Sequence, residues 1–314
     1  LSLDAMPVRS TAQVLTSSDE VDGAPVYVAD SANSATALAT GVVTSRGRIA
    51  TTAGSDEDIV TIAEQALAAG LRAGLVASAN VTDATPASFV AHISKRWCEN
   101  PEVMVNATIY QRMTVDCSAD TLAEGGRGSI SQQIATSDMH VVMGGGQKHF
   151  APQAEGREQS VRELAQANGF KVVNTLAEMQ AAPDSRRILG LFSESTLPVR
   201  LAGEDGRKAE KFDRSWLNRV YHYFGSAEAP APMACVANPD YGATPTLAAM
   251  TEKALAVLNE GNERGFFLMV ESASIDKQSH YRQPCGSIGE LEQLNEVLDL
   301  ALAFAAANPS TLVL

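Results

Sequence analysis

Short apolar runs alternate along the chain with longer amphipathic segments, and this alternation predicts the elements of the fold. Helix starts and stops are marked by capping residues and by glycines just past the helix ends. The predicted strands are residues 26–28, 75–77, 140–143, 170–173, 187–192, 266–270 and 311–314. The predicted helices are residues 31–40, 56–69, 85–93, 158–167, 176–181, 245–259 and 287–306. Such alternation is typical of an α/β fold, a three-layer αβα sandwich around a large, mostly parallel sheet.

The composition narrows the classes of protein to consider. The chain has 314 residues with 45% hydrophobic and 19% charged residues, which is ordinary for a globular protein. A net charge of −13 argues against a basic nucleic-acid-binding face. No apolar run approaches the roughly 18 residues of a membrane span, so no membrane partner is expected. The first residues, Leu1 to Asp4, have neither the basic nor the apolar part of a signal peptide, although the chain can begin downstream of one.

The cysteines indicate an oxidising compartment. Cys98, Cys117, Cys235 and Cys285 form no C-x-x-C pair, which disfavours a zinc knuckle. An even number at wide spacing suits two disulfides. Four cysteines permit three connectivities, of which the sequential pairing, Cys98–Cys117 and Cys235–Cys285, is the simplest. Four buried thiols in a cytosolic protein remain the alternative.

Ser31 is the first candidate for chemistry. It follows Asp30 at the predicted start of a helix, where the helix N-terminus stabilises nearby negative charge. That position suits a serine nucleophile or a phosphorylated serine, and the simpler interpretation is a helix-capping serine. The chain has no G-x-S-x-G elbow, which disfavours a serine hydrolase of the α/β-hydrolase type.

Two further groups follow predicted strands. Asp83 and Thr85 offer the hard oxygen donors that suit Mg²⁺, and Arg96 could hold two phosphate oxygens with its planar guanidinium. The alternative for this group is a capping turn and a surface arginine. Asp276 and His280 are four residues apart, so one helical turn places both on one face as a candidate zinc pair.

Glu271 belongs to the last of these groups. It ends the apolar run 266–270, where a carboxylate is costly unless it binds something. The alternative for this group is a solvated loop.

Together these segments resemble the bacterial alkaline phosphatases over essentially the whole chain. The matching segments are D-S-A-N-S-A-T-A-L-A-T-G (30–41), D-A-T-P-A-S-F-V-A-H (83–92) with Arg96, V-V-M-G-G-G-Q-K-H-F (141–150), V-E-S-A-S-I-D-K-Q-S-H (270–280) and P-C-G-S-I-G-E (284–290). Several motifs in the same order are far more specific than any one of them. The resemblance implies an alkaline phosphatase-like fold, the sequential disulfide pairing, a periplasmic or secreted location and a homodimer.

The resemblance also implies a phosphate monoester hydrolase that acts through a covalent phosphoserine at a two-zinc, one-magnesium site. By this carry-over Ser31 is the nucleophile and Arg96 holds phosphate, whether substrate ester or inorganic phosphate. The remaining residues that resemble family site positions have these implied roles: Thr85 and Glu271 as Mg²⁺ ligands, Asp83 in the outer shell of Mg²⁺, Asp276 and His280 as Zn²⁺ ligands, and Lys277 as the residue that pairs with Asp83 and reaches phosphate through water.

One departure from the family pattern bears on activity. Family members have a further metal-bridging aspartate on an earlier strand, and an Asp-His pair and another histidine beyond the strand corresponding to residues 311–314. None of these four ligands lies in this chain. The resemblance therefore implies a single domain over residues 1–314, incomplete at both ends and catalytically incomplete, with an irregular insertion at about 202–244. The alternatives are a non-catalytic metal- or phosphate-binding protein, or a phosphodiesterase of the same superfamily.

Overall fold

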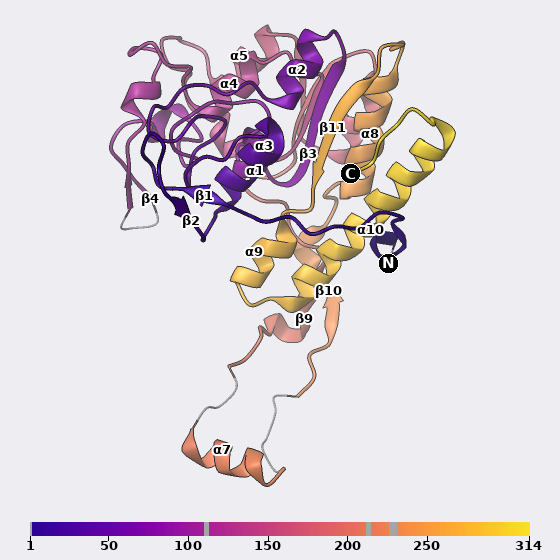
Figure 1. Ribbon diagram of the computed structural model, residues 1–314. Coiled ribbons are helices and arrows are strands. Elements are labelled where there is room, and N and C mark those ends of the chain that lie inside the picture. Colours follow the sequence, from indigo (N-terminus) through magenta and orange to yellow (C-terminus); the bar gives the residue numbers. More distant parts are fainter. Residues whose placement is uncertain (1, 110–112, 212–214, 226–230) are drawn as a thin grey trace.

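A parallel five-stranded sheet forms the centre of the protein (Figure 1). The computed structural model describes residues 2–109, 113–211, 215–225 and 231–314. The strand order is β11-β3-β6-β8-β7, and all neighbouring strands are parallel. The strands are β3 (Arg72–Asn80), β6 (Val141–Gly145), β7 (Phe170–Val173), β8 (Arg187–Leu191) and β11 (Phe266–Glu271). The predicted mostly parallel sheet is therefore confirmed.

Helices cover both faces of this sheet (Figure 1). Side chains alternate along the strands, so that Leu75 and Val142 enter one apolar core while Val76 and Val141 enter the other. The first core is covered by α1 (Ser31–Thr40), α2 (Ile62–Ala68), α3 (Ala84–Ala87), α4 (Ile130–Thr136) and α5 (Val161–Ala167). The second is covered by α6 (Leu176–Ala181), α8 (Leu247–Asn259) and α10 (Pro284–Ala307). These layers confirm the predicted αβα sandwich.

Several predicted helices are shorter than the sequence pattern indicates; the one predicted over 158–167, for example, begins at Val161. The helix predicted over 56–69 begins only at Ile62, because Thr61 caps it together with Glu64 and because Asp56 has a left-handed backbone, with φ of 56°. The helix predicted over 85–93 is the four-residue α3. Its N-cap is Asp83, whose carboxylate accepts from the Ala84 amide. The sequence pattern did not predict α4.

Two predicted strands are wrong. In the region 26–28 only Val26 is in a strand, β2 (Pro25–Val26), which pairs with β1 (Thr16–Ser17) outside the central sheet. Tyr27 and Val28 are exposed. Residues 311–314 form no strand, and Leu312 is exposed. Both runs are too short for periodicity to separate a strand from an exposed apolar loop, and within the described part of the chain neither pairs with the central sheet.

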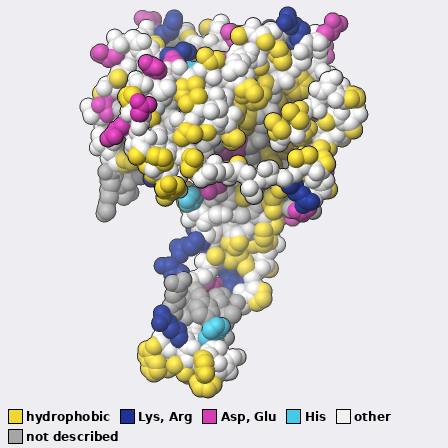
Figure 2. Space-filling model, viewed as in Figure 1, with side chains coloured by type: hydrophobic (Ala, Val, Ile, Leu, Met, Phe, Trp, Pro, Cys, Tyr) yellow, Lys and Arg dark blue, Asp and Glu magenta, His cyan; other side chains and the backbone are white. Residues whose placement is uncertain are grey.

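The predicted irregular segment at 202–244 forms an arm that projects from the sheet domain (Figure 1), with residues 212–214 and 226–230 outside the described part. At its base β9 (Leu201–Gly203) pairs antiparallel with β10 (Cys235–Ala237). A disulfide joins Cys235 to Cys285 of α10. The far end of the arm carries α7 (Trp216–Tyr223), and Figure 2 shows apolar side chains gathered there. Trp216 is 71% exposed.

The remaining elements are short. The hairpin of β4 (Ala107–Ile109) and β5 (Met113–Val115) lies between the two cysteines of the other disulfide, Cys98–Cys117. Both disulfides follow the sequential pairing. The 3₁₀ helices of the described ranges are Ser2–Ala5, Pro101–Val103, Ser118–Asp120, Gln147–His149, Glu204–Gly206 and Pro239–Tyr241, and α9 (Ser274–His280) completes the elements. Among the described residues no helix is both long enough and apolar enough to cross a membrane.

Candidate active site

The candidate residues gather at the carboxyl edge of the sheet, around β3 and β11. Asp83 lies in the turn just after β3, which ends at Asn80, and Glu271 is the last residue of β11. Because parallel strands all end at the same edge, polar groups that follow them converge there. This edge is where ligands bind in open α/β sheets.

Ser31 is the first residue of α1 and is exposed. Asp30 caps the helix: its Oδ1 accepts from the Asn33 amide at 3.1 Å, and its own amide donates to Asn33 Oδ1 at 2.8 Å. The capping box fixes the first turn, so the Ser31 hydroxyl is held at the positive end of a ten-residue helix. A negative charge on or near Oγ is favoured at this position.

Arg96 connects Ser31 to Asp83. Its Nη1 donates to Ser31 Oγ and, at 3.3 Å, to Asp30 Oδ2. Its Nη2 donates to Asp83 Oδ1 at 2.8 Å. Lys277 of α9 forms an ion pair with the other oxygen of Asp83. Four residues that are far apart in the sequence therefore form one continuous chain of charge-assisted contacts.

The charges in this chain are mutually stabilising. Burial raises the pKa of Asp83, but the positive charges of Lys277 and Arg96 outweigh burial and hold that pKa below its ordinary value. Burial lowers the pKa of Lys277, but the charge and hydrogen bond of Asp83 together with the charge of Glu271 outweigh burial, so the pKa lies above its usual value. Asp83 is therefore anionic and Lys277 cationic, and the Arg96 guanidinium places its own positive charge against Ser31 Oγ.

Glu271 fits a hard cation. One carboxylate oxygen, Oε2, is buried and has no hydrogen-bond partner among the described residues, which is costly for a charged group. Burial raises the pKa of Glu271 to about 7, while a hydrogen bond with Thr85 acts in the opposite direction. Asp83, Thr85 and Glu271 present only oxygen donors, the type that Mg²⁺ prefers.

Asp276 and His280 lie one turn apart on α9, as predicted, with Nε2 of the histidine 3.4 Å from Oδ2 of the aspartate. Both side chains are more than three-quarters exposed. Their donor types suit Zn²⁺, but a catalytic zinc usually has three protein ligands. No cluster of three or more His, Cys, Asp or Glu able to hold a metal occurs in the ranges that the structure describes.

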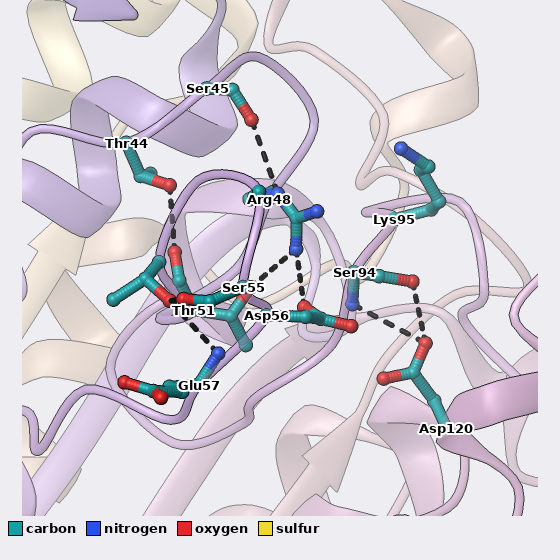
Figure 3. A network of polar contacts seen from close by, with 12 residues as sticks. Thr44, Ser45, Arg48, Thr51, Ser55, Asp56, Glu57, Ser94, Lys95 and Asp120 are labelled. Carbon is teal, nitrogen blue, oxygen red and sulfur yellow. Dashed lines mark hydrogen bonds and ion pairs between the residues drawn. The ribbon is translucent and has the colours of Figure 1, made fainter. Parts of the chain in front are cut away.

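A polar network that the sequence did not reveal supports the loop beside Ser31 (Figure 3). Arg48 is buried and donates to Ser45, Thr51 and Asp56. The preceding residue, Gly47, donates its amide to Asp30 Oδ1 at 3.2 Å, and its carbonyl accepts from the Arg96 amide at 2.7 Å. The loop thus joins the backbone of the Arg96 segment to the cap of α1.

Gly47 and Asp120 complete this support. The φ of Gly47 is 83°, in the left-handed region that favours glycine, and the Trp97 ring lies next to it. On the other side Ser94 Oγ donates to Asp120 Oδ2 at 2.5 Å (Figure 3). The segment 94–96 is therefore held from two directions. No short motif marks Arg48 or Asp120, because their partners lie in other loops.

His92 has a structural place close to this loop. Its Nδ1 lies 2.9 Å from the carbonyl of Ala50, a residue with a left-handed φ of 44°, and its Nε2 lies 2.9 Å from Glu64 Oε1. Burial lowers the pKa of His92, but the hydrogen bonds to Glu64 and Ala50 outweigh burial and raise the pKa above 6.5. Burial raises the pKa of Glu64, but the hydrogen bonds to His92 and Thr61 and the charge of His92 together outweigh burial and hold the pKa below 4.5.

We therefore expect the His92–Glu64 pair to make stability depend on pH. A raised histidine pKa stabilises the fold below pH 6.5, and this contribution is lost as pH rises through the folded pKa. The lowered Glu64 pKa contributes above pH 4.5 and is lost at lower pH. His92→Gln should lower the free energy of unfolding by about 1–2 kcal/mol more near pH 5.5 than near pH 8.5. Urea unfolding of both proteins measures this, and an equal difference at the two pH values would contradict it.

The fold defines an α/β protein with a central parallel sheet. At the carboxyl edge of this sheet, a serine at a helix N-terminus contacts Arg96, which is joined through Asp83 to Lys277. The family model for alkaline phosphatase matches residues 2–314. This chain belongs to the alkaline phosphatase family, as its motifs indicated.

Individual relatives agree with this assignment. The alkaline phosphatase of Escherichia coli (strain K12) is 40% identical over 299 residues, which cover 93% of this chain and 58% of that protein. Alkaline phosphatase H of Pseudomonas aeruginosa (strain UCBPP-PA14) is 40% identical over 320 residues, covering 99% and 61%. The chain thus spans about three-fifths of the length of these relatives. The cold-active alkaline phosphatase of a Shewanella species shares the fold, with a TM-score of 0.62 at 24% identity over 94% of this chain and 55% of that one.

Proposed function

We propose that this protein hydrolyses phosphate monoesters through a covalent phosphoserine at Ser31. The observation that carries the proposal is the direct contact of Arg96 Nη1 with Ser31 Oγ, while Nη2 of the same guanidinium is held by Asp83. A phosphoryl group bonded to Oγ would lie against a fixed, always protonated fork of donors. It would also lie at the N-terminus of α1, where its negative charge is stabilised.

The proposed reaction has two displacements. Ser31 Oγ attacks phosphorus, the P–Oγ bond forms, the P–O bond to the alcohol breaks, and the alcohol leaves with one proton. Water then attacks phosphoserine, the P–Oγ bond breaks, Ser31 regains a proton and inorganic phosphate leaves. Arg96 stabilises the equatorial oxygens in both steps, and Lys277, held by Asp83, acts on phosphate through water.

Metals are part of the proposal. Thr85 and Glu271 would hold Mg²⁺, with Asp83 in its outer shell, and Asp276 and His280 would give two ligands to one of two Zn²⁺ ions. When bound, such metals lower the pKa of a coordinated hydroxyl and stabilise charge on oxygen. The family also supports a homodimer and a periplasmic or secreted location, and the two disulfides fit an oxidising compartment.

Removing the buried carboxylate is expected to remove Mg²⁺ binding. Glu271→Gln replaces a charged ligand with a neutral amide of the same shape. Mutation of an outer-shell partner lowers metal affinity by up to about a hundredfold, so the loss of a direct ligand should lower Mg²⁺ affinity by at least that much. Isothermal titration calorimetry with MgCl₂ measures this without any turnover. Glu292→Gln on α10 is the matched control. Equal Mg²⁺ affinity in Glu271→Gln and the control would contradict the assignment.

Substrate choice separates the proposed activity from its alternatives. The protein, expressed at the full length that its gene encodes, should hydrolyse p-nitrophenyl phosphate in the presence of Zn²⁺ and Mg²⁺. It should act poorly on bis(p-nitrophenyl) phosphate and on p-nitrophenyl sulfate. Preference for the diester would indicate a phosphodiesterase, and metal and phosphate binding without any turnover would indicate the non-catalytic alternative.

A further inference from the structure

A second polar cluster lies behind Asp83, built around the carboxylate of Glu99. Glu99 Oε2 accepts from Thr82 Oγ1 at 2.5 Å and from Asn80 Nδ2 at 3.2 Å. His149, whose side chain is 8% exposed, places its Nε2 3.1 Å from the same oxygen and 3.1 Å from Asn80 Nδ2. Two hydrogen-bond donors, from Asn80 and Thr82, therefore converge on one carboxylate oxygen. None of these residues is used by the reaction proposed above.

His149 lies between two amide side chains. Its Nδ1 is 3.0 Å from Asn100 Nδ2, and its Nε2 is 3.1 Å from Asn80 Nδ2. Asn80, which donates to Glu99, is therefore itself in contact with His149.

The electrostatic environment agrees with a neutral histidine beside a buried carboxylate. Burial, followed by the charge of Lys148, lowers the pKa of His149 to about 4. Burial also raises the pKa of Glu99, and the nearby Asp83 charge adds to this, while the bonds from Thr82 and Asn80 act against it. The cluster therefore depends on hydrogen bonds to Glu99 rather than on an ion pair.

The position of Glu99 relates it to the phosphate site. Thr82 directly precedes Asp83, and Glu99 stands three residues after Arg96. The Thr82–Glu99 bond and the Asp83–Arg96 bond therefore connect the same two segments side by side. The Cys98–Cys117 disulfide fixes the segment on the Arg96 side, and His149, just past the end of β6, supports Glu99 from behind.

We propose that Glu99 is a positioning residue that fixes the Asp83 loop relative to the Arg96 segment and thereby sets the affinity of the site for phosphate. This inference rests on the proposed function of Arg96. Glu99 does not contact phosphate and acts through Thr82 and Asp83. If the Thr82–Glu99 bond is lost, the Arg96–Asp83 bond alone must hold the guanidinium in its position beside Ser31.

The direct test is phosphate affinity in Glu99→Gln and Thr82→Val. Glutamine replaces the charged acceptor of Thr82 and Asn80 with a neutral amide, and valine removes the Thr82 hydroxyl at nearly constant volume. Each variant should weaken inorganic phosphate binding about tenfold, the equivalent of one well-placed hydrogen bond. Calorimetric titration with inorganic phosphate should be done at a temperature well below the midpoint of thermal unfolding of each variant. Thr82→Ser, which keeps the hydroxyl, and Glu102→Gln, on an exposed side chain, should bind as the wild type does.

The outcomes distinguish this inference from the function on which it rests. Unchanged phosphate affinity in Glu99→Gln, even with a lower unfolding midpoint, would show a purely structural role and overturn the inference alone. Equal phosphate affinity in Thr82→Val and Thr82→Ser would also overturn it. Failure of the wild type to bind phosphate would overturn the proposed function and this inference with it.

Discussion

Replacing Ser31 with alanine is expected to lower p-nitrophenyl phosphate turnover by at least about a thousandfold, because the substitution removes the oxygen atom that would form the covalent intermediate. Zinc and magnesium contents should change little, since the proposed ligands from Asp83, Thr85, Glu271 and α9 are untouched. The fold should also be retained, because Ser31 is exposed and Asp30, not Ser31, caps α1.

Ser34→Ala is the matched control for Ser31→Ala. Ser34 lies on the same helix one turn further on, so the substitution makes the same chemical change away from the helix end. Its turnover should stay within about twofold of the wild type, as expected for a change away from special features. Comparable losses in both variants would indicate that the start of α1 matters only for structure.

Replacing Arg96 with alanine is expected to weaken competitive inhibition by inorganic phosphate by one to two orders of magnitude. A charge-assisted, bidentate contact contributes about 1.5–3 kcal/mol, which corresponds to a change of one to two orders of magnitude in binding. Arg96→Lys should fall between the wild type and Arg96→Ala, because lysine keeps the charge but cannot donate to Ser31 and Asp83 with one planar group.

Arg127→Ala controls for the loss of one positive charge. Arg127 is more than half exposed and pairs with Asp58, away from the Ser31–Arg96 chain, so phosphate inhibition should be unchanged. If phosphate inhibits Arg96→Ala as strongly as the wild type, Arg96 does not bind phosphate. Its contact with Ser31 would then have only a structural role.

Much of the fold could be predicted from the sequence, because buried strands and capped helices leave local signals. The strands β6, β7, β8 and β11 lie within or next to the apolar runs that predict them. The errors occur where local pattern and tertiary context disagree. Residues 311–314 have the pattern of a strand but pair with no strand of the described chain, and the length of α3 is decided by the Asp83 cap and the irregular chain beyond it.

The candidate site was predictable in its members and in one contact, the Asp83–Lys277 pair, which the structure confirms. The contacts of Arg96 with Ser31 and Asp83 were not predicted. Sequence reasoning also did not identify Glu99, because a single acidic residue after a cysteine has no periodicity or spacing that marks it. Its partners Asn80 and Thr82 lie in another segment, at and just beyond the end of β3.

The most direct test of the central claim is to find where phosphate is bonded during turnover. The wild-type protein should be incubated with a phosphate monoester or inorganic phosphate, quenched in acid, digested and analysed by mass spectrometry. The account predicts one phosphorylated peptide, with the phosphoryl group on Ser31 and none in the Ser31→Ala variant. Phosphate trapped on another residue, or trapped equally well in Ser31→Ala, would contradict the account.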